Sequence, residues 1–284
     1  MRLFTIIIGM NNSNRISILA TMLVSLLISC GGRSAQQGDS GSKDGGNAAK
    51  QEVVMAKIYD YRVVASYPHS KRSYTQGLQY VDGTMWEGTG QYGRSQLQCV
   101  DLATGKVKCL ASLPDNEFGE GITLYKGNIY QLTWESHKAY LYDTNGNILK
   151  TIAYKGEGWG ITTDGERLFL SDGSSTIRRI DPETFETLES ICVTLDGQPL
   201  DLINELEWVD GSIWANIYLT DAIVEIDPAT GVVKGYVDLP RLRDMLEKNP
   251  EAEAFNGVAY NADSGHFYVT GKDWNRLFEI EIIK

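Results

Sequence analysis

Five segments of the chain open in the same way, with a polar residue or Trp next to a glycine or small turn, followed by an apolar, strand-like run. Only one opening residue is titratable. A single carboxylate among amides and aromatic rings suits general acid/base chemistry, because burial raises its pKa. Short-strand repeats of this size indicate a β-propeller, whose innermost strands face one axis and would bring the openings together. The openings are Gln76, Glu120, Trp159, Asn204 and Asn256.

Four of the segments end in a hairpin whose turn begins with Asp, a residue whose carboxylate bonds backbone N–H groups two residues on. The separations between successive turns are 42, 38 and 46 residues, close to the roughly 40–50 residues of a four-stranded blade. The sequence therefore predicts an all-β fold, a five-bladed β-propeller over residues 56–284. A β-sandwich or barrel is the alternative, but it does not explain the repeated openings. The turn residues are Asp101, Asp143, Asp181 and Asp227.

Two segments complete the predicted fold. The fifth blade lacks an outer strand, and residues 56–66 alternate as a strand that could pair with the C-terminal strand and close the ring without an exposed edge. Residues 240–254 have apolar side chains at helical spacing, which predicts a short helical insertion between blades four and five.

The N-terminal residues predict export. Residues 1–29 contain no acidic residue and end in an apolar run too short for a membrane span, which is the layout of a signal peptide. Leu27-Ile28-Ser29-Cys30 resembles the bacterial lipobox, so Cys30 is expected to carry lipid. Residues 30–55 predict a flexible tether. We expect a bacterial lipoprotein anchored to the inner or outer membrane, facing the periplasm or the cell surface.

Charge and cysteines narrow the partners and the redox state. Without residues 1–29, 24 Lys and Arg stand against 37 Asp and Glu, a net charge of −13 that disfavours nucleic acid. We expect a monomer that meets the membrane only through its lipid. Cys99 and Cys109 flank the first hairpin symmetrically, which predicts that they face each other. A disulfide and a pair of reduced thiols are both compatible with that placement.

The chain offers few other groups for catalysis. His69, His137 and His266 have no metal-ligand spacing, and no His-Glu-x-x-His or Cys-x-x-Cys occurs, so a catalytic zinc site is not expected. The serine-nucleophile motif Gly-x-Ser-x-Gly does not occur either. The string from Gly88 to Gly93 matches a dinucleotide fingerprint but precedes a strand, so the match is accidental. What remains is Glu120, expected near Trp134, Trp159 and Trp214, with Lys272 where a strand leaves the fifth blade.

At these residues the chain resembles the plant-type glutaminyl cyclases, or glutamine cyclotransferases, over about residues 58–284. Tyr74 stands where Phe is expected in plant members. The motifs that carry the resemblance are Tyr74-Thr-Gln-Gly-Leu78, Glu87-Gly-Thr-Gly-Gln-Tyr-Gly93, Phe118-Gly-Glu-Gly-Ile122, Gln131-Leu-Thr-Trp134, Gly158-Trp-Gly160, Ser171-Asp-Gly-Ser-Ser175, Asn204-Glu-Leu-Glu-Trp208, Ile213-Trp-Ala-Asn-Ile-Tyr218 and Val269-Thr-Gly-Lys-Asp-Trp274.

The resemblance implies a five-bladed propeller that converts the N-terminal glutamine of peptides and proteins to pyroglutamate with release of ammonia. Glu120 is implied as the general acid/base. No cofactor is implied for catalysis, although a structural cation such as calcium is expected in the central channel. The implied substrate-binding residues are Tyr74, Gln76, Phe118, Trp134, Trp159, Asn204, Trp214 and Lys272.

Two alternatives from other classes stay open at this point. A non-catalytic surface propeller that binds a peptide or glycan would keep the aromatic residues but tolerate Gln at position 120. A metal-dependent lactonase-type propeller would need an axial cage of Glu, Asn and Asp. Trp159 at one of the five openings disfavours that cage.

Overall fold

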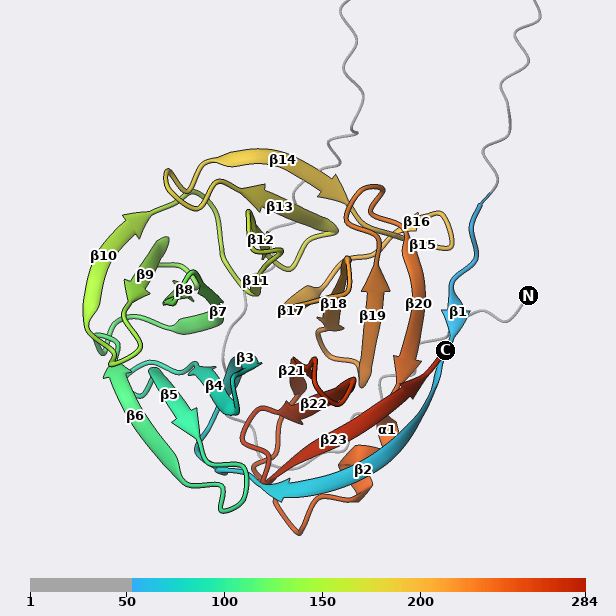
Figure 1. The fold of residues 1–284 in the computed structure, drawn as a ribbon, viewed down its shortest axis with the longest axis horizontal. Coiled ribbons are helices and arrows are strands. Elements are labelled where there is room, and N and C mark those ends of the chain that lie inside the picture. The colour runs from blue at the N-terminus through green and yellow to red at the C-terminus, as the bar shows by residue number, and fades with distance from the viewer. Residues whose placement is uncertain (1–52) are drawn as a thin grey trace, which may run out of the picture. The chain divides into compact units, whose positions relative to one another are not determined.

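The predicted propeller is confirmed. The computed structural model describes residues 53–284, in which five sheets lie around a common axis (Figure 1). The signal peptide, most of the tether and Cys30 lie outside the described residues. No described helix has the length and apolar character needed to cross a membrane.

Blades one to four are antiparallel meanders, and in blade five the N-terminal strand completes a meander of three strands. Blade one consists of β3 (Thr75–Val81), β4 (Thr84–Thr89), β5 (Gln96–Val100) and β6 (Val107–Ser112). Blade two consists of β7 (Gly119–Tyr125), β8 (Asn128–Thr133), β9 (Lys138–Tyr142) and β10 (Ile148–Ala153). Blade three consists of β11 (Ile161–Thr163), β12 (Leu168–Ser171), β13 (Thr176–Ile180) and β14 (Thr187–Cys192). Blade four consists of β17 (Ile203–Val209), β18 (Ser212–Ile217), β19 (Ala222–Ile226) and β20 (Val233–Asp238). Blade five consists of β21 (Phe255–Asn261), β22 (His266–Gly271), β23 (Arg276–Ile283) and β2 (Asp60–Pro68).

The ring closes through the N-terminal segment, as predicted. Strand β2 pairs antiparallel with β23 along its whole length, and the two lie side by side at the edge of blade five (Figure 1). The strand expected over residues 56–66 is divided, because β1 (Lys57–Ile58) pairs in parallel with β20 of blade four. Tyr59 lies between the two strands and packs over Gly235, where an added Cβ would lie 2.2 Å from its ring. The N-terminal segment therefore joins two blades.

The turns between the outer strands of the first four blades follow the predicted chemistry. Each Asp carboxylate accepts hydrogen bonds from backbone N–H groups of its own turn, such as Thr104 N to Asp101 Oδ1 at 2.9 Å. Three of these turns have a glycine with positive φ near their end. In blade three Phe185 takes this place at φ 60°, and its buried ring packs against Tyr130 and Tyr154. Aromatic packing there offsets the cost of a left-handed backbone.

The innermost strands approach one another through glycines. An added Cβ would lie 2.4 Å from Ile122 N at Gly77, 2.7 Å from Trp159 O at Gly121, and 2.2 Å from Asn204 O at Gly160. Real Cβ atoms do not come this close to a neighbouring backbone, so the inner strands can lie this near the axis only without side chains here. The glycine that follows each of these openings thus sets the width of the channel.

Blade four differs at this position, because Glu205 replaces the glycine. Its carboxylate crosses the axis and accepts hydrogen bonds from Leu78 N of blade one at 3.0 Å and Val258 N of blade five at 2.9 Å. Burial and the neighbouring Glu207 carboxylate raise the pKa of Glu205 well above its usual value. The sequence analysis counted one titratable group at the openings and missed this second carboxyl.

Two small elements complete the fold. Strands β15 (Thr194–Leu195) and β16 (Gln198–Pro199) form a two-stranded ribbon between blades three and four. The expected helix over residues 240–254 is shorter than predicted. Only α1 (Pro240–Asp244) is helical, with Pro240 in its first turn and Leu242 buried against blades four and five.

The predicted facing of Cys99 and Cys109 is wrong. The register that runs outward from the hairpin turn places Cys109 opposite Gln98 and Cys99 opposite Lys108, and a bulge follows only beyond them, between Leu97 and Gln98. Because neighbouring residues on a strand point to opposite faces, a shift of one residue places the two thiols on different faces of the blade. Both cysteines are free, and no disulfide joins them.

We predict that Gly160→Ala destabilises the domain, because its Cβ meets the backbone of blade four and neither strand can move freely. The expected loss in the free energy of unfolding is about 1–3 kcal/mol, the range for overpacking, measured by urea denaturation. Gly127→Asn is the control. Gly127 lies in an exposed turn at φ 79° with no atom within 4 Å of an added Cβ, and Asn tolerates this conformation. Equal stability of the two variants would contradict the packing argument.

Candidate active site

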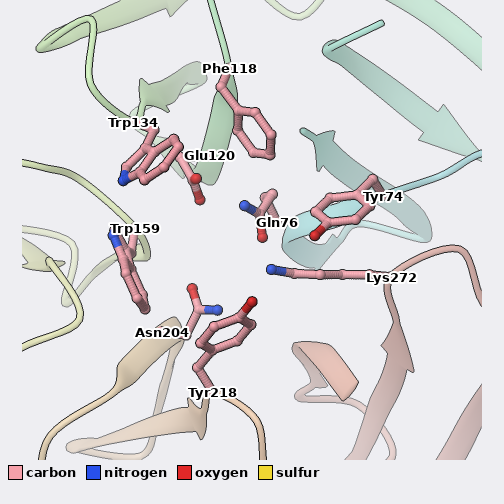
Figure 2. Close-up of a pocket in the computed structure, with 9 residues that line it drawn as sticks. All are labelled: Tyr74, Gln76, Phe118, Glu120, Trp134, Trp159, Asn204, Tyr218 and Lys272. Atoms are coloured by element: carbon pink, nitrogen blue, oxygen red, sulfur yellow. The ribbon is translucent and has the colours of Figure 1, made fainter. Parts of the chain in front are cut away.

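A pocket opens at one end of the propeller axis. It has a volume of about 240 Å³, smaller than the roughly 300–1,000 Å³ of drug-sized ligand sites, so it suits a group the size of one amino-acid residue. Every predicted catalytic or substrate-binding residue except Trp214 lines it, together with Tyr218. The side chains converge from all five blades or their loops (Figure 2). The lining residues are Tyr74, Gln76, Phe118, Glu120, Trp134, Trp159, Asn204, Tyr218 and Lys272.

The floor of the pocket is polar and buried. Gln76, Glu120 and Asn204 come from three of the repeated openings, and each is at most 4% exposed. Trp159, from a fourth opening, forms part of the wall. The fifth opening residue, Asn256, does not line the pocket. Its Nδ2 instead donates hydrogen bonds to Thr75 O at 3.0 Å and Gln76 Oε1 at 3.4 Å.

A second set of equivalent positions completes the lining of the pocket. Trp134 directly follows β8, Tyr218 directly follows β18 and Lys272 directly follows β22, so each is the first residue after the second strand of its blade. The openings of blades one to four and the second-strand exits of blades two, four and five therefore point to the same end of the axis. This equivalence is the sequence signal that could have found Tyr218.

Trp214 was wrongly expected in the pocket. It lies inside β18, 1% exposed, with ring centroids 4.8 Å from Phe267 and 6.2 Å from Tyr59 in the core between blades four and five. Four residues along a strand correspond to about 13 Å, which separates Trp214 from the strand exit where Tyr218 lies. Trp214 is a core residue.

Aromatic rings surround the mouth. Phe118 packs edge-on against Tyr74 at 6.0 Å and against Trp134 at 5.9 Å. On the other side, Trp159 packs against Tyr218 at 5.7 Å. Lys272 extends between the two tyrosines, with Nζ 4.9 Å from the Tyr74 ring and 4.7 Å from the Tyr218 ring (Figure 2). These cation–π contacts keep the buried ammonium group in place.

Burial shifts the pKa values of both charged residues at the floor. Burial raises the pKa of Glu120 well above its usual value, and the Lys272 charge and a hydrogen bond from Gln76 only partly oppose this. Burial likewise lowers the pKa of Lys272, against the attraction of Glu120 and Glu253. A carboxyl whose pKa is raised toward neutral pH can both accept and donate a proton near neutral pH.

One polar atom at the floor is left for a ligand. Asn204 Oδ1 is buried and has no hydrogen-bond partner in the protein. A buried amide oxygen without a partner is costly, which points to a donor supplied by the bound molecule. Asn204 is 2% exposed and directed into the pocket (Figure 2).

The axial residues do not fit the expected calcium ion. Calcium takes about six to eight oxygen ligands, several of them carboxylates. Both carboxylate oxygens of Glu205 instead accept backbone N–H groups across the axis. Within residues 53–284 no three His, Cys, Asp or Glu side chains come together as a metal site.

Fold and site define a class of protein, a five-bladed β-propeller with one small acid/base pocket at the end of its axis. The family model described as glutamine cyclotransferase matches residues 41–282. A glutaminyl-peptide cyclotransferase of Arabidopsis thaliana is 37% identical over 232 residues, which cover 80% of this chain and 72% of that protein. The chain belongs to the glutamine cyclotransferase family and is an enzyme of that class.

Solved structures agree with this assignment. The crystal structure of Myxococcus xanthus glutaminyl cyclase superposes with a TM-score of 0.73 at 34% identity, covering 80% of this chain and 98% of that one. A PQQ-bound aldose sugar dehydrogenase from Streptomyces coelicolor has a TM-score of 0.53 at 11% identity, covering 79% of this chain and 98% of that one. The second likeness is one of fold alone.

We predict that the Glu120 carboxyl titrates well above 4.5 and that Lys272→Met raises its pKa further. The sign follows because the Lys272 cation stabilises the carboxylate form, so its removal favours the protonated form. Carbon-13 NMR of the glutamate side-chain carboxyls checks this, with Glu120→Gln identifying the resonance. A Glu120 pKa near 4.5, or one that falls in Lys272→Met, would contradict the electrostatic account.

Proposed function

We propose that this protein converts the N-terminal glutamine of peptides and proteins to pyroglutamate with release of ammonia, without a metal or cofactor. The observation that carries the proposal is a buried carboxyl beside a buried ammonium at the floor of a one-residue pocket, in a chain of the glutamine cyclotransferase family. The residue roles below are part of the same proposal.

The nucleophile is the substrate's own α-amine. Its pKa of about 7.7–8.0 leaves a useful neutral fraction at mildly alkaline pH. The amine nitrogen must meet the γ-carboxamide carbon within the same residue, and a small closed pocket selects the folded conformer. The aromatic walls of Phe118, Trp134 and Trp159 bound the space in which the side chain folds back.

Glu120 moves the proton. As the bond between the amine nitrogen and the carboxamide carbon forms, the carboxylate accepts a proton from that nitrogen. It then donates the proton to the departing amide nitrogen, the carbon–nitrogen bond breaks, and ammonia leaves. The net reaction needs no other acid or base, and Glu120 ends in the state in which it began.

The remaining floor residues hold the substrate. Asn204 Oδ1, which lacks a partner in the protein, accepts a hydrogen bond from a substrate N–H group. Lys272 Nζ stabilises the carboxamide oxygen as it gains negative charge. Gln76 bonds the Glu120 carboxyl and is itself held by Asn256.

We predict that Glu120→Gln lowers kcat by at least ~100-fold, the lower end for general acid/base catalysis, with little change in thermal stability. The amide keeps the shape of the side chain but cannot transfer the proton. Ammonia release from a peptide with N-terminal Gln measures the rate. A kcat within about tenfold of the wild type would exclude Glu120 as the catalyst, and peptide binding by an inactive wild type would favour the non-catalytic alternative.

Activity should survive a strong zinc chelator, because the proposed route uses only Glu120, Lys272 and the substrate amine. The measurement is ammonia release before and after dialysis against the chelator. A complete loss that zinc restores would refute the metal-independent route.

We also propose that Cys30 is lipidated and that the propeller faces the periplasm or cell surface as a monomer. Cys30→Ser should leave an uncleaved or differently cleaved precursor, while a truncated chain that begins near Gln51 should be soluble and fully active. Labelled fatty acid incorporated equally into wild type and Cys30→Ser would refute the lipid site. An inactive truncated chain would show that the preceding residues contribute to the domain.

A further inference from the structure

Glu157, which the sequence analysis did not single out, connects two walls of the pocket. It lies in the loop between β10 and β11, and a single carboxylate oxygen, Oε2, accepts a hydrogen bond from each of two indoles. The distances are 2.7 Å from Trp134 Nε1 and 3.0 Å from Trp159 Nε1. The two indole nitrogens point to the same side, away from the centre of the pocket (Figure 2).

These contacts complete the circle of aromatic side chains around the mouth of the pocket. Phe118 contacts Trp134, and Trp159 contacts Tyr218, but no direct ring contact joins the two tryptophans. Glu157 bridges that gap from outside, as Lys272 bridges the two tyrosines on the opposite side. Trp134 follows the second strand of blade two and Trp159 opens blade three, so the carboxylate also fixes one blade relative to the next.

The loop is built to hold this carboxylate. Arg178 Nη2 donates to Glu157 O and Nη1 donates to Lys155 O, both at 2.8 Å. Gly158 leaves no room for a side chain, since an added Cβ would lie 2.3 Å from the Tyr154 hydroxyl. The backbone on both sides of Glu157 is therefore fixed by contacts with the blades.

We propose that Glu157 is a positioning residue for the cyclisation, which holds Trp134 and Trp159 in the orientation that closes the pocket around the first residue of the substrate. The proposal rests on the proposed function. Glu157 touches the indoles and not the reacting atoms, so it acts through the pocket walls.

The charge of Glu157 has a second effect. Glu157 raises the pKa of Glu120, although less strongly than burial does. The other titratable groups that interact with the Glu120 charge are Lys272 and four tyrosine hydroxyls whose pKa values are raised, those of Tyr74, Tyr92, Tyr154 and Tyr218. Removing the negative charge at position 157 therefore lowers the pKa of Glu120, and an acid limb of kcat/KM set by Glu120 moves to lower pH.

The first test does not depend on activity. In nitrogen-15 spectra of the full-length chain, the indole N–H signals of Trp134 and Trp159, assigned by substitution with Phe, should both move in Glu157→Gln and Glu157→Ala. They should stay in place in Glu135→Gln, a matched control that removes the same charge from an exposed residue next to Trp134. If neither signal moves in Glu157→Ala, the bridge does not exist and the proposal fails, whatever the enzyme catalyses.

The second test separates hydrogen bonding from charge. Glu157→Ala should lower kcat/KM by about tenfold or more, mainly through KM, because misplaced walls no longer select the folded substrate. Glu157→Gln, which keeps an acceptor oxygen, should recover most of that loss but shift the acid limb of kcat/KM to lower pH. Glu135→Gln should change neither kcat/KM nor the pH of its acid limb.

The outcomes are distinguishable from failure of the proposed function. A wild type that releases no ammonia refutes the cyclase, while the indole spectra still test the bridge. Glu157→Ala within about twofold of the wild type overturns the positioning role. Glu157→Gln as impaired as Glu157→Ala also overturns it, because the acceptor would then not matter.

Discussion

The site depends on how closely the five inner strands approach the axis. Gly77, Gly121 and Gly160 each place a bare backbone against the next blade, where a Cβ would overlap its atoms. Because the strands meet at this distance, the residues one position before these glycines meet as well, and they form most of the floor and part of the wall of one pocket. Glu205 stabilises the same arrangement from inside, with hydrogen bonds to blades one and five. A wider axis would separate the floor residues, and no single substrate residue could reach all of them.

The narrow axis also determines the electrostatics. Glu120 and Lys272 are each 4% exposed, and burial moves their pKa values in opposite directions, both toward neutral forms. If water entered the pocket, it would solvate both charges and remove most of these pKa shifts. The side chains stand at the ends of strands and not on long loops, so their positions are fixed before the substrate arrives. Preorganised polar groups in a dry site are the most effective way to stabilise charge that develops in a reaction.

At the mouth of the pocket, charged side chains hold the aromatic wall together. Aromatic rings supply a water-excluding wall, but rings from different blades do not all contact one another. Lys272 connects two tyrosines through their faces, and Glu157 connects two tryptophans through their N–H edges. The faces of aromatic rings are negative and their N–H edges positive, which explains why the cation lies between faces and the anion between edges. The wall is thus held by electrostatic contacts at the two places where packing alone leaves a gap.

By itself the sequence determined the repeat, the Asp and Gly residues of the turns, and the opening positions, because each of these is a local requirement of a strand or a turn. Of the catalytic and substrate-binding residues predicted from those patterns and from the family motifs, all but Trp214 lie at the pocket. The tertiary structure decided the rest. The register of the first hairpin separates Cys99 from Cys109, since an offset of one residue places a side chain on the opposite face of the blade. Tyr218 replaces Trp214 at the pocket because the end of β18, and not its middle, reaches the end of the axis where the pocket opens. Glu205 and Glu157 act on residues of other blades, and such contacts exist only once the ring has closed.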